Sequence, residues 1–135
     1  MKSPWLLFLI IAGAMAAGCT GEMRLSTSSP VALRSYQEAV TLYEKFYYRE
    51  ALDSLNRAIA ADSSFAMAWA RRGMINAELK DREKARRDVA RALALSPGTT
   101  PPERLLIRMW NDWISYEPAA AASAADSLSI DFERE

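Results

Sequence analysis

The sequence contains no histidine, only one cysteine and no excess of charge of either sign. Without histidine, neither a serine–histidine nor a cysteine–histidine nucleophile can be assembled. The single cysteine, Cys19, cannot form a disulfide within the chain and leaves no ligand set typical of zinc. Lysine and arginine number 17, as do aspartate and glutamate, so charge indicates neither nucleic acid nor an anionic membrane as a partner. We therefore expect no metal, no cofactor and no nucleic-acid partner.

The first eighteen residues have the composition of a signal peptide. Lys2 precedes an apolar run from Trp5 to Ala17, and small residues come directly before Cys19. A basic start, an apolar run too short to span a bilayer and a small-residue cleavage site are typical of secretion signals. Residues 1–18 are therefore predicted to be a signal peptide, and half of the sequence is hydrophobic, which suffices for one small folded domain.

The stretch Met15–Cys19 resembles the lipobox of bacterial lipoproteins. This resemblance implies that Cys19 is lipidated, becomes the new N-terminus and anchors the protein to a membrane. The residue after the cysteine is Thr20 and not aspartate. In similar lipoproteins of diderm bacteria, this implies attachment to the outer membrane, facing the periplasm. The alternative is an ordinary signal peptide, or an N-terminal helix, with an idle cysteine. Residues 19–31, rich in serine and threonine, are predicted to be the lipidated cysteine and a flexible tether.

Matched residues recur at a constant offset of thirty-four positions. Ala51 and Ala85 form one such pair, and Ala58 and Ala92 form another. A period of this length is typical of helical-hairpin arrays. Within each unit the apolar residues follow two successive helical faces, separated by a short turn. We therefore predict an all-α fold of two helical hairpins over residues 32–65 and 66–99.

The matched residues resemble the tetratricopeptide repeat (TPR). Small side chains fall where the two helices of a hairpin cross, and Phe46 stands where the family usually has a turn glycine. The resemblance implies a short α-solenoid that binds proteins. The predicted structural repeat positions are Ala39, Ala51, Ala58, Trp69, Gly73, Ala85, Ala92 and Pro97.

A further helix is predicted over residues 100–117. Thr100 and Glu103 have the spacing of a capping box, and Pro101 suits the first turn. This helix is expected to cover the open end of the array, although a partner, a second copy or a degenerate third repeat could account for its wide apolar band. Residues 118–135 are rich in alanine, serine and acidic residues, and we expect a disordered tail there.

In TPR proteins the ligand groove is lined mainly by the first helix of each repeat. The resemblance therefore implies an apolar protein-binding groove, and the alternative is that these residues pack against neighbouring helices. Arg71 lies nearby but alone, and the lysine and asparagine set of chaperone-tail-binding TPR domains is absent. The predicted groove residues are Leu33, Tyr36, Val40, Tyr43, Met67, Ala70, Met74 and Ala77.

These expectations favour a lipid-anchored adaptor that holds a protein partner in the bacterial cell envelope and aids assembly of an envelope complex. The alternative is a structural lipoprotein that forms homo-oligomers through the helix at 100–117. An enzyme is a third class, but carboxylates such as Glu38 and Glu44 occupy surface-type helical positions without a pocket pattern. We therefore expect no catalytic residues.

Overall fold

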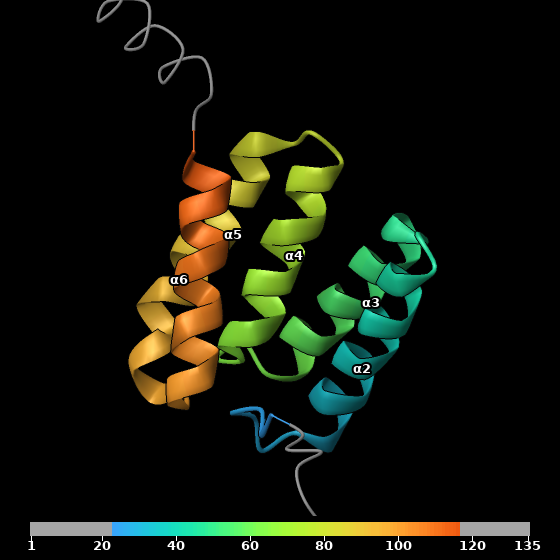
Figure 1. Cartoon of the computed structure of the whole chain (residues 1–135). Helices are drawn as coiled ribbons and strands as arrows, with labels where there is room; N and C mark the ends of the chain where they lie inside the picture. Colours follow the sequence, from blue (N-terminus) through green and yellow to red (C-terminus); the bar gives the residue numbers. More distant parts are fainter. Residues whose placement is uncertain (1–22, 117–135) are drawn as a thin grey trace, which may run out of the picture.

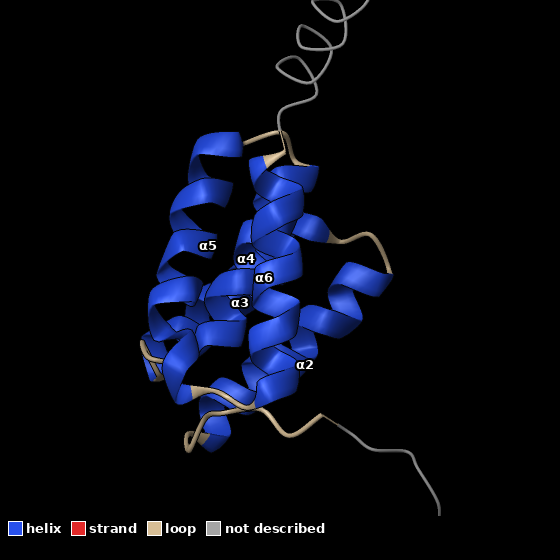
Figure 2. Cartoon of the chain, turned by 60° about the vertical axis from the view of Figure 1, so that its left-hand side comes forward, coloured by secondary structure: helices blue, strands red, loops and turns tan. Residues whose placement is uncertain are grey.

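The computed structural model describes residues 23–116, and this part of the chain is built from helices without strands (Figures 1 and 2). The predicted signal peptide, Cys19 and the predicted tail at 118–135 lie outside the described residues. Within them, no helix is long and apolar enough to cross a bilayer. The elements are α2 (Pro30–Glu44), α3 (Tyr48–Ala61), α4 (Ala66–Glu78), α5 (Arg82–Leu95), the 3-10 turn η1 (Ser96–Gly98) and α6 (Pro101–Ser115).

The helices form two stacked hairpins followed by one more helix. Helix α2 packs on α3, α4 packs on α5, and α3 joins the two hairpins by packing on α4 (Figure 1). Helix α6 then packs on both α5 and α4. The predicted all-α short solenoid is confirmed, with two helical hairpins and a C-terminal helix in the expected order.

Local sequence signals account for most of the helix starts. Ser29 and Asp81 each accept a hydrogen bond from a backbone N–H of the first helical turn, which satisfies a donor that has no partner inside the helix. Pro30 follows Ser29 at the first helical position, where its missing N–H costs nothing. The predicted capping box of Thr100 and Glu103 forms at the start of α6.

Both hairpin turns require a left-handed residue. Phe46 has φ 64° and Lys80 has φ 65°, and the two residues are thirty-four positions apart. The turn therefore keeps the conformation for which glycine is the usual residue, although a side chain is present. Phe46 is also 77% exposed, so its ring gains little from burial that could offset this conformational cost.

The predicted repeat positions separate into two groups. The small residues at the helix crossings are inaccessible to solvent, namely Ala39, Ala51, Ala58, Ala85 and Ala92, and Gly73 is buried with them. Trp69 is half-buried and its indole Nε1 donates to the carbonyl oxygen of Ser63 at 2.9 Å. Pro97 is exposed in η1, where the chain leaves α5.

Gly73 marks the closest approach of α4 to α5. A Cβ atom at this position would lie 3.1 Å from the carbonyl oxygen of Ala85 and 3.3 Å from the backbone nitrogen of Val89. Both contacts are with the backbone of a helix, which cannot rotate away as a flexible side chain can. The absence of a side chain at Gly73 therefore sets the spacing of the second hairpin.

The segment before α2 is folded against the helices, so the prediction of a flexible tether over 19–31 is wrong for residues 23–29. Met23 and Leu25 pack as partly buried side chains against the main hydrophobic core. The segment lies at the end of the molecule where α2 begins, opposite the C-terminal end of α6 (Figure 1). Its serine-rich and threonine-rich composition suggested disorder, but its hydroxyl groups have specific partners.

Two carboxylates hold this segment in place. Glu103, inaccessible to solvent, accepts hydrogen bonds from the backbone nitrogen of Ser26 at 2.8 Å and from its hydroxyl at 2.5 Å. The same carboxylate accepts the backbone N–H of Thr100 at 2.8 Å. Thr27 donates its hydroxyl to Asp62 at 2.5 Å. Residues far apart in the sequence are therefore joined at one end of the fold.

Asp62 is stabilised in its charged form. Burial would raise its pKa, but hydrogen bonds from Thr27 and Ser64 outweigh this effect and hold the pKa below its ordinary value of 3.8. The contribution of these hydrogen bonds to stability is present above the unfolded-state pKa and is lost as the pH falls through the lower folded-state value. At neutral pH, Asp62 is thus an acceptor for the docked segment.

We predict that Gly73→Leu lowers the free energy of unfolding by about 1–3 kcal/mol, because the new side chain must displace the backbone of α5. Leucine is a good helix former, so the loss cannot come from helix propensity. Gly98→Leu is the control, since nothing lies within 4 Å of its Cβ position. Urea unfolding followed by circular dichroism measures both variants, and equal stabilities would contradict the close crossing.

We also predict that Glu103→Gln lowers the free energy of unfolding by about 2 kcal/mol, because one acceptor oxygen becomes a donor facing other donors. The amide hydrogen of Ser26 should exchange faster with solvent in this variant, as hydrogen exchange detected by NMR will show. Glu83→Gln, whose side chain is 84% exposed, serves as the control. Unchanged protection of Ser26 would argue against the docking of residues 23–29.

Candidate functional site

One face of α2 presents four of the predicted groove residues. Leu33, Tyr36, Val40 and Tyr43 follow helical spacing along it, so they point to the same side. Leu33, Val40 and Tyr43 are half-buried, whereas Tyr36 is only 4% exposed. The accessible part of the predicted groove on α2 is therefore aliphatic in its first half and aromatic at its end.

The predicted groove residues on α4 are less accessible. Met67 and Ala70 are inaccessible to solvent and belong to the core, so their assignment to a ligand-contacting surface is wrong. Met74 and Ala77 are half-buried and pack in a second apolar cluster that contains Ile114 of α6. These residues are less accessible because α6 packs on α4 and covers the face that two repeats alone would leave open.

Arg71 of α4 lies among three aromatic rings from other helices. Its guanidinium carbon is 4.7 Å from the centre of the Trp110 ring on α6. It is 5.9 Å and 5.8 Å from the ring centres of Tyr36 and Tyr43 on α2. We call these four residues the Arg71 cluster. Since each distance lies within the range of a cation–π contact, the guanidinium connects the first hairpin to α6.

The surroundings of Tyr43 in the Arg71 cluster keep this tyrosine neutral. Burial raises the pKa of Tyr43 above its ordinary value of 10.0, and the nearby Glu78 and Tyr48 raise it further. The positive charge of Arg71 opposes this shift only in part. Tyr43 is therefore a neutral phenol at physiological pH, and the cluster carries the positive charge of Arg71.

The sequence pattern identified Arg71 but assigned it no neighbours, and it predicted only a wide apolar band for the last helix, which contains Trp110. The contacts of Arg71 with Tyr36 and Tyr43 depend on how the first hairpin packs beside α4. The contact with Trp110 requires the packing of α6 on α4, which no local pattern specifies. The repeat period alone could not have found the complete cluster.

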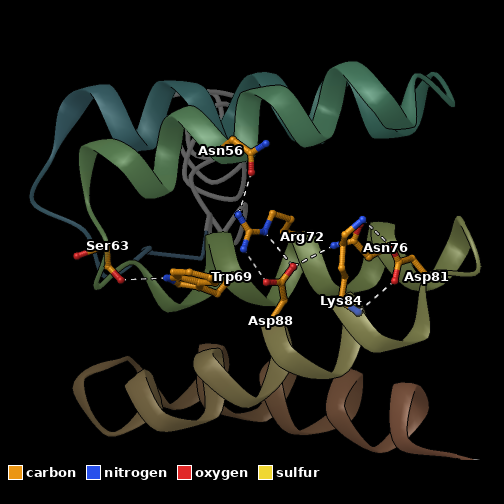
Figure 3. A network of polar contacts seen from close by, with 8 residues as sticks. All are labelled: Asn56, Ser63, Trp69, Arg72, Asn76, Asp81, Lys84 and Asp88. Carbon is orange, nitrogen blue, oxygen red and sulfur yellow. Dashed lines mark hydrogen bonds and ion pairs between the residues drawn. The ribbon is translucent and has the colours of Figure 1, made fainter.

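A separate polar cleft of about 540 Å³ lies on another side of α4, between α3 and α5. Arg72 crosses it and makes two hydrogen bonds with Asp88, from Nε at 2.9 Å and from Nη2 at 2.6 Å. Arg72 also donates to Asn56 at 2.8 Å, and Asn76 donates to Asp88 at 3.0 Å. Figure 3 shows these side chains converging from three helices.

The charges in this cleft compensate one another. Besides its pair with Asp88, Arg72 lies 4.6 Å from the ring centre of Trp69. At the rim, Lys84 pairs with Asp81 at 2.7 Å, as Figure 3 also shows. Because each of these polar groups has a partner, we assign the cleft a structural role: it stabilises the packing of α4 on α5, and its hydrogen bond to Asn56 reaches the first hairpin.

Two observations on the described residues concern metal binding and the carboxylate of Glu38. Within residues 23–116, no three side chains of the ligand types His, Cys, Asp and Glu are grouped so that they could hold a metal ion. Glu38, considered above for a carboxylate pair with Glu44, instead forms an ion pair with Arg57 at 2.7 Å. Both partners of that pair are exposed, so it is a surface interaction.

Comparison with known proteins supports the fold. No protein-family model matches the sequence, and no curated protein matches it significantly. Among solved structures, the chain is similar to the second TPR of Spaghetti (RPAP3), bound to the HSP90 peptide SRMEEVD. The TM-score is 0.56 at 19% sequence identity, and the similarity covers 77% of this chain and 88% of the other. The chain therefore has the fold of a TPR domain.

We predict that Asp88→Ala lowers the free energy of unfolding by roughly 2–4 kcal/mol, because it leaves Arg72 and Asn76 without their shared acceptor. Glu38→Ala is the matched control, and removal of this exposed partner should cost less than about 1 kcal/mol. Chemical unfolding of the two variants gives the comparison. Similar losses would show that the contacts of Arg72 and Asn76 with Asp88 do not stabilise the packing of α4 on α5.

Proposed function

We propose that this protein is an adaptor that holds a peptide segment of a protein partner along α2 and the Arg71 cluster, without catalysing a reaction. The observation that supports this most is the combination of a TPR fold with a half-exposed aliphatic and aromatic face on α2. Apolar side chains with a few placed polar groups are typical of peptide-binding surfaces. The similar TPR structure, which contains a bound peptide, lends further support.

The side chains of this surface support peptide contact rather than catalysis. Leu33 and Val40 provide aliphatic contact, and Tyr43 provides an aromatic ring with a hydroxyl that can donate a hydrogen bond. The chain contains no histidine, and the Arg71 cluster contains no carboxylate that could act as a base. Binding without chemistry is the function that these side chains support.

We further propose that the adaptor is anchored through a lipid on Cys19, facing the periplasm from the outer membrane of the cell envelope. The lipobox-like stretch Met15–Cys19 supports this assignment. Because residues 23–29 pack on the helices, only residues 19–22 would separate the lipid from the folded domain, a reach of at most about 14 Å. The anchor would then hold the domain close to the membrane with the start of α2 nearest the lipid.

This geometry suits assembly of an envelope complex. Helix α2 would run away from the membrane, and the turn containing Phe46 would lie at the far end of the domain (Figure 1). A partner bound along α2 would be held at a fixed height above the lipid surface. Such an adaptor would raise the local concentration of its partner where an envelope complex is built.

The test is an affinity capture from envelope extract with the folded domain, compared between Val40→Asp and Val31→Asp. Both changes put a carboxylate on α2, but Val31 is 51% exposed at the helix start and Val40 lies in the proposed surface. We expect a partner identified by mass spectrometry to be captured about tenfold less by Val40→Asp and undiminished by Val31→Asp.

Circular dichroism must show that both variants keep the helical content of the unmodified protein. Equal capture by the three proteins would place the binding surface elsewhere and contradict the proposal. The anchor is tested separately, because replacement of Cys19 by serine should release the protein from the membrane fraction without altering capture.

An alternative function is supported by one exposed stripe on α6. Leu105, Met109 and Trp113 lie one helical turn apart and are 62%, 55% and 52% exposed. A second copy covering this stripe would make the protein a structural lipoprotein that forms homo-oligomers. Recovery of only its own copies in the capture experiment would support this alternative over the adaptor.

A further inference from the structure

Arg71 lacks a charged partner in the part of the chain that the structure describes. No Asp or Glu side chain of residues 23–116 lies within 4.0 Å of its guanidinium, whereas Arg57 and Arg72 each form an ion pair. Its only hydrogen bond there is a long one, 3.4 Å from Nη2 to the hydroxyl of Tyr36. A guanidinium has five N–H donors in a planar fork, so most of its hydrogen-bonding capacity is unused.

Part of this unused capacity is buried. The Nε atom of Arg71 is the one side-chain nitrogen or oxygen among the described residues that is buried without a hydrogen-bond partner. A buried donor without a partner is unfavourable, and such groups in folded proteins call for an explanation. The arginine as a whole is half-buried, so a ligand can reach the remainder of the group.

The surroundings of Arg71 favour binding of an anion. The rings of Tyr36, Tyr43 and Trp110 lie within about 6 Å of the guanidinium carbon, and apart from the long hydrogen bond to the Tyr36 hydroxyl they offer it only π contacts. An ionic hydrogen bond formed beside these rings is stronger than one formed in open solvent. The aromatic rings also fix the orientation of the guanidinium, which lowers the entropy lost when a ligand binds.

The charge of the site selects a monoanion. Arg71 is the single cation in the Arg71 cluster, and Glu78 lies close enough to Tyr43 to raise the pKa of that tyrosine. A phosphate dianion would meet one positive charge and a nearby negative one, which is a poor match. A carboxylate carries one negative charge, and its two oxygens match the planar fork of an arginine.

We propose that Arg71 binds a carboxylate of the partner peptide, beside an apolar residue that contacts the aliphatic part of α2. The carboxylate is either an aspartate or glutamate side chain or the C-terminal carboxylate of the peptide. This proposal rests on the proposed function and specifies the chemistry of its ligand. It assigns to Arg71 the recognition of a negative charge, which the uncharged residues of the surface cannot provide.

The test is an NMR titration of the folded domain with three dipeptide probes that share one apolar residue. N-acetyl-leucyl-glutamate amide carries only a side-chain carboxylate, N-acetyl-leucyl-glutamine carries only a C-terminal carboxylate, and N-acetyl-leucyl-glutamine amide carries none. The signals followed are the Nε–H of Arg71 and the indole N–H of Trp110. We expect at least one acidic probe to shift both signals with an affinity about tenfold higher than that of the neutral probe.

Variants of Arg71 separate charge recognition from a structural role. Arg71→Gln should reduce the advantage of the acidic probe to less than about twofold, and Arg71→Lys should retain only part of it because the planar fork is lost. Arg91→Gln, an exposed arginine on α5, is the matched control and should leave binding unchanged. Thermal unfolding shows whether each variant is folded.

Two results would overturn the carboxylate site. One is equal binding of the three probes, and the other is no shift from any of them up to about 50 mM. Capture of the protein partner separates failure of the carboxylate site from failure of the proposed adaptor function. Loss of that partner from Val40→Asp with full retention by Arg71→Gln would contradict the carboxylate site and leave the adaptor function standing.

Discussion

The structure depends on how closely the two helices of each hairpin can approach each other. Alanine and glycine occupy the crossings, and a methyl group at Gly73 would lie only 3.1 Å from the backbone of α5. Few large side chains are fully buried, and Phe65, Leu55 and Met67 are the largest of them. Because small side chains contribute little apolar area, the stability of the fold must come from close packing over the whole length of each helix. A larger residue at a crossing would separate the helices and weaken all of these contacts together.

Glu103 extends this packing to the N-terminal segment of the described chain. It is inaccessible to solvent and is held by N–H and O–H donors from Ser26 and Thr100. A buried carboxylate is costly unless its oxygens are hydrogen-bonded, so the segment before α2 must dock to complete the site. Glu103 thereby links the entry of the chain to the start of α6. This arrangement favours one register of the docked segment, because a shift by one residue would leave the carboxylate without its partners.

The limits of sequence-based prediction follow from which interactions are local. The period relating Ala51 to Ala85 reports spacings within and between neighbouring helices, and it predicted the hairpins correctly. The burial of Met67 depends instead on the helices packed around α4, so the resemblance to TPR repeats misassigned this residue to the groove. The docking of Ser26 on Glu103 joins residues 77 positions apart, and neither residue has a local pattern that indicates the other. Composition alone therefore predicted a flexible segment where the chain is folded.

Two adjacent arginines on α4 show why the faces of this fold have different roles. Arg72 points into the cleft between α3 and α5, where Asp88 and Asn56 satisfy its guanidinium. Arg71, one residue earlier and therefore about 100° around the helix, meets the aromatic rings of α2 and α6 and no carboxylate among the described residues. The guanidinium of Arg71 connects α4 to these rings, but apart from one long hydrogen bond to Tyr36 its N–H donors have no partner among the described residues. The proposed carboxylate of a bound peptide would supply the missing partner, because it matches the guanidinium in charge and in planar shape.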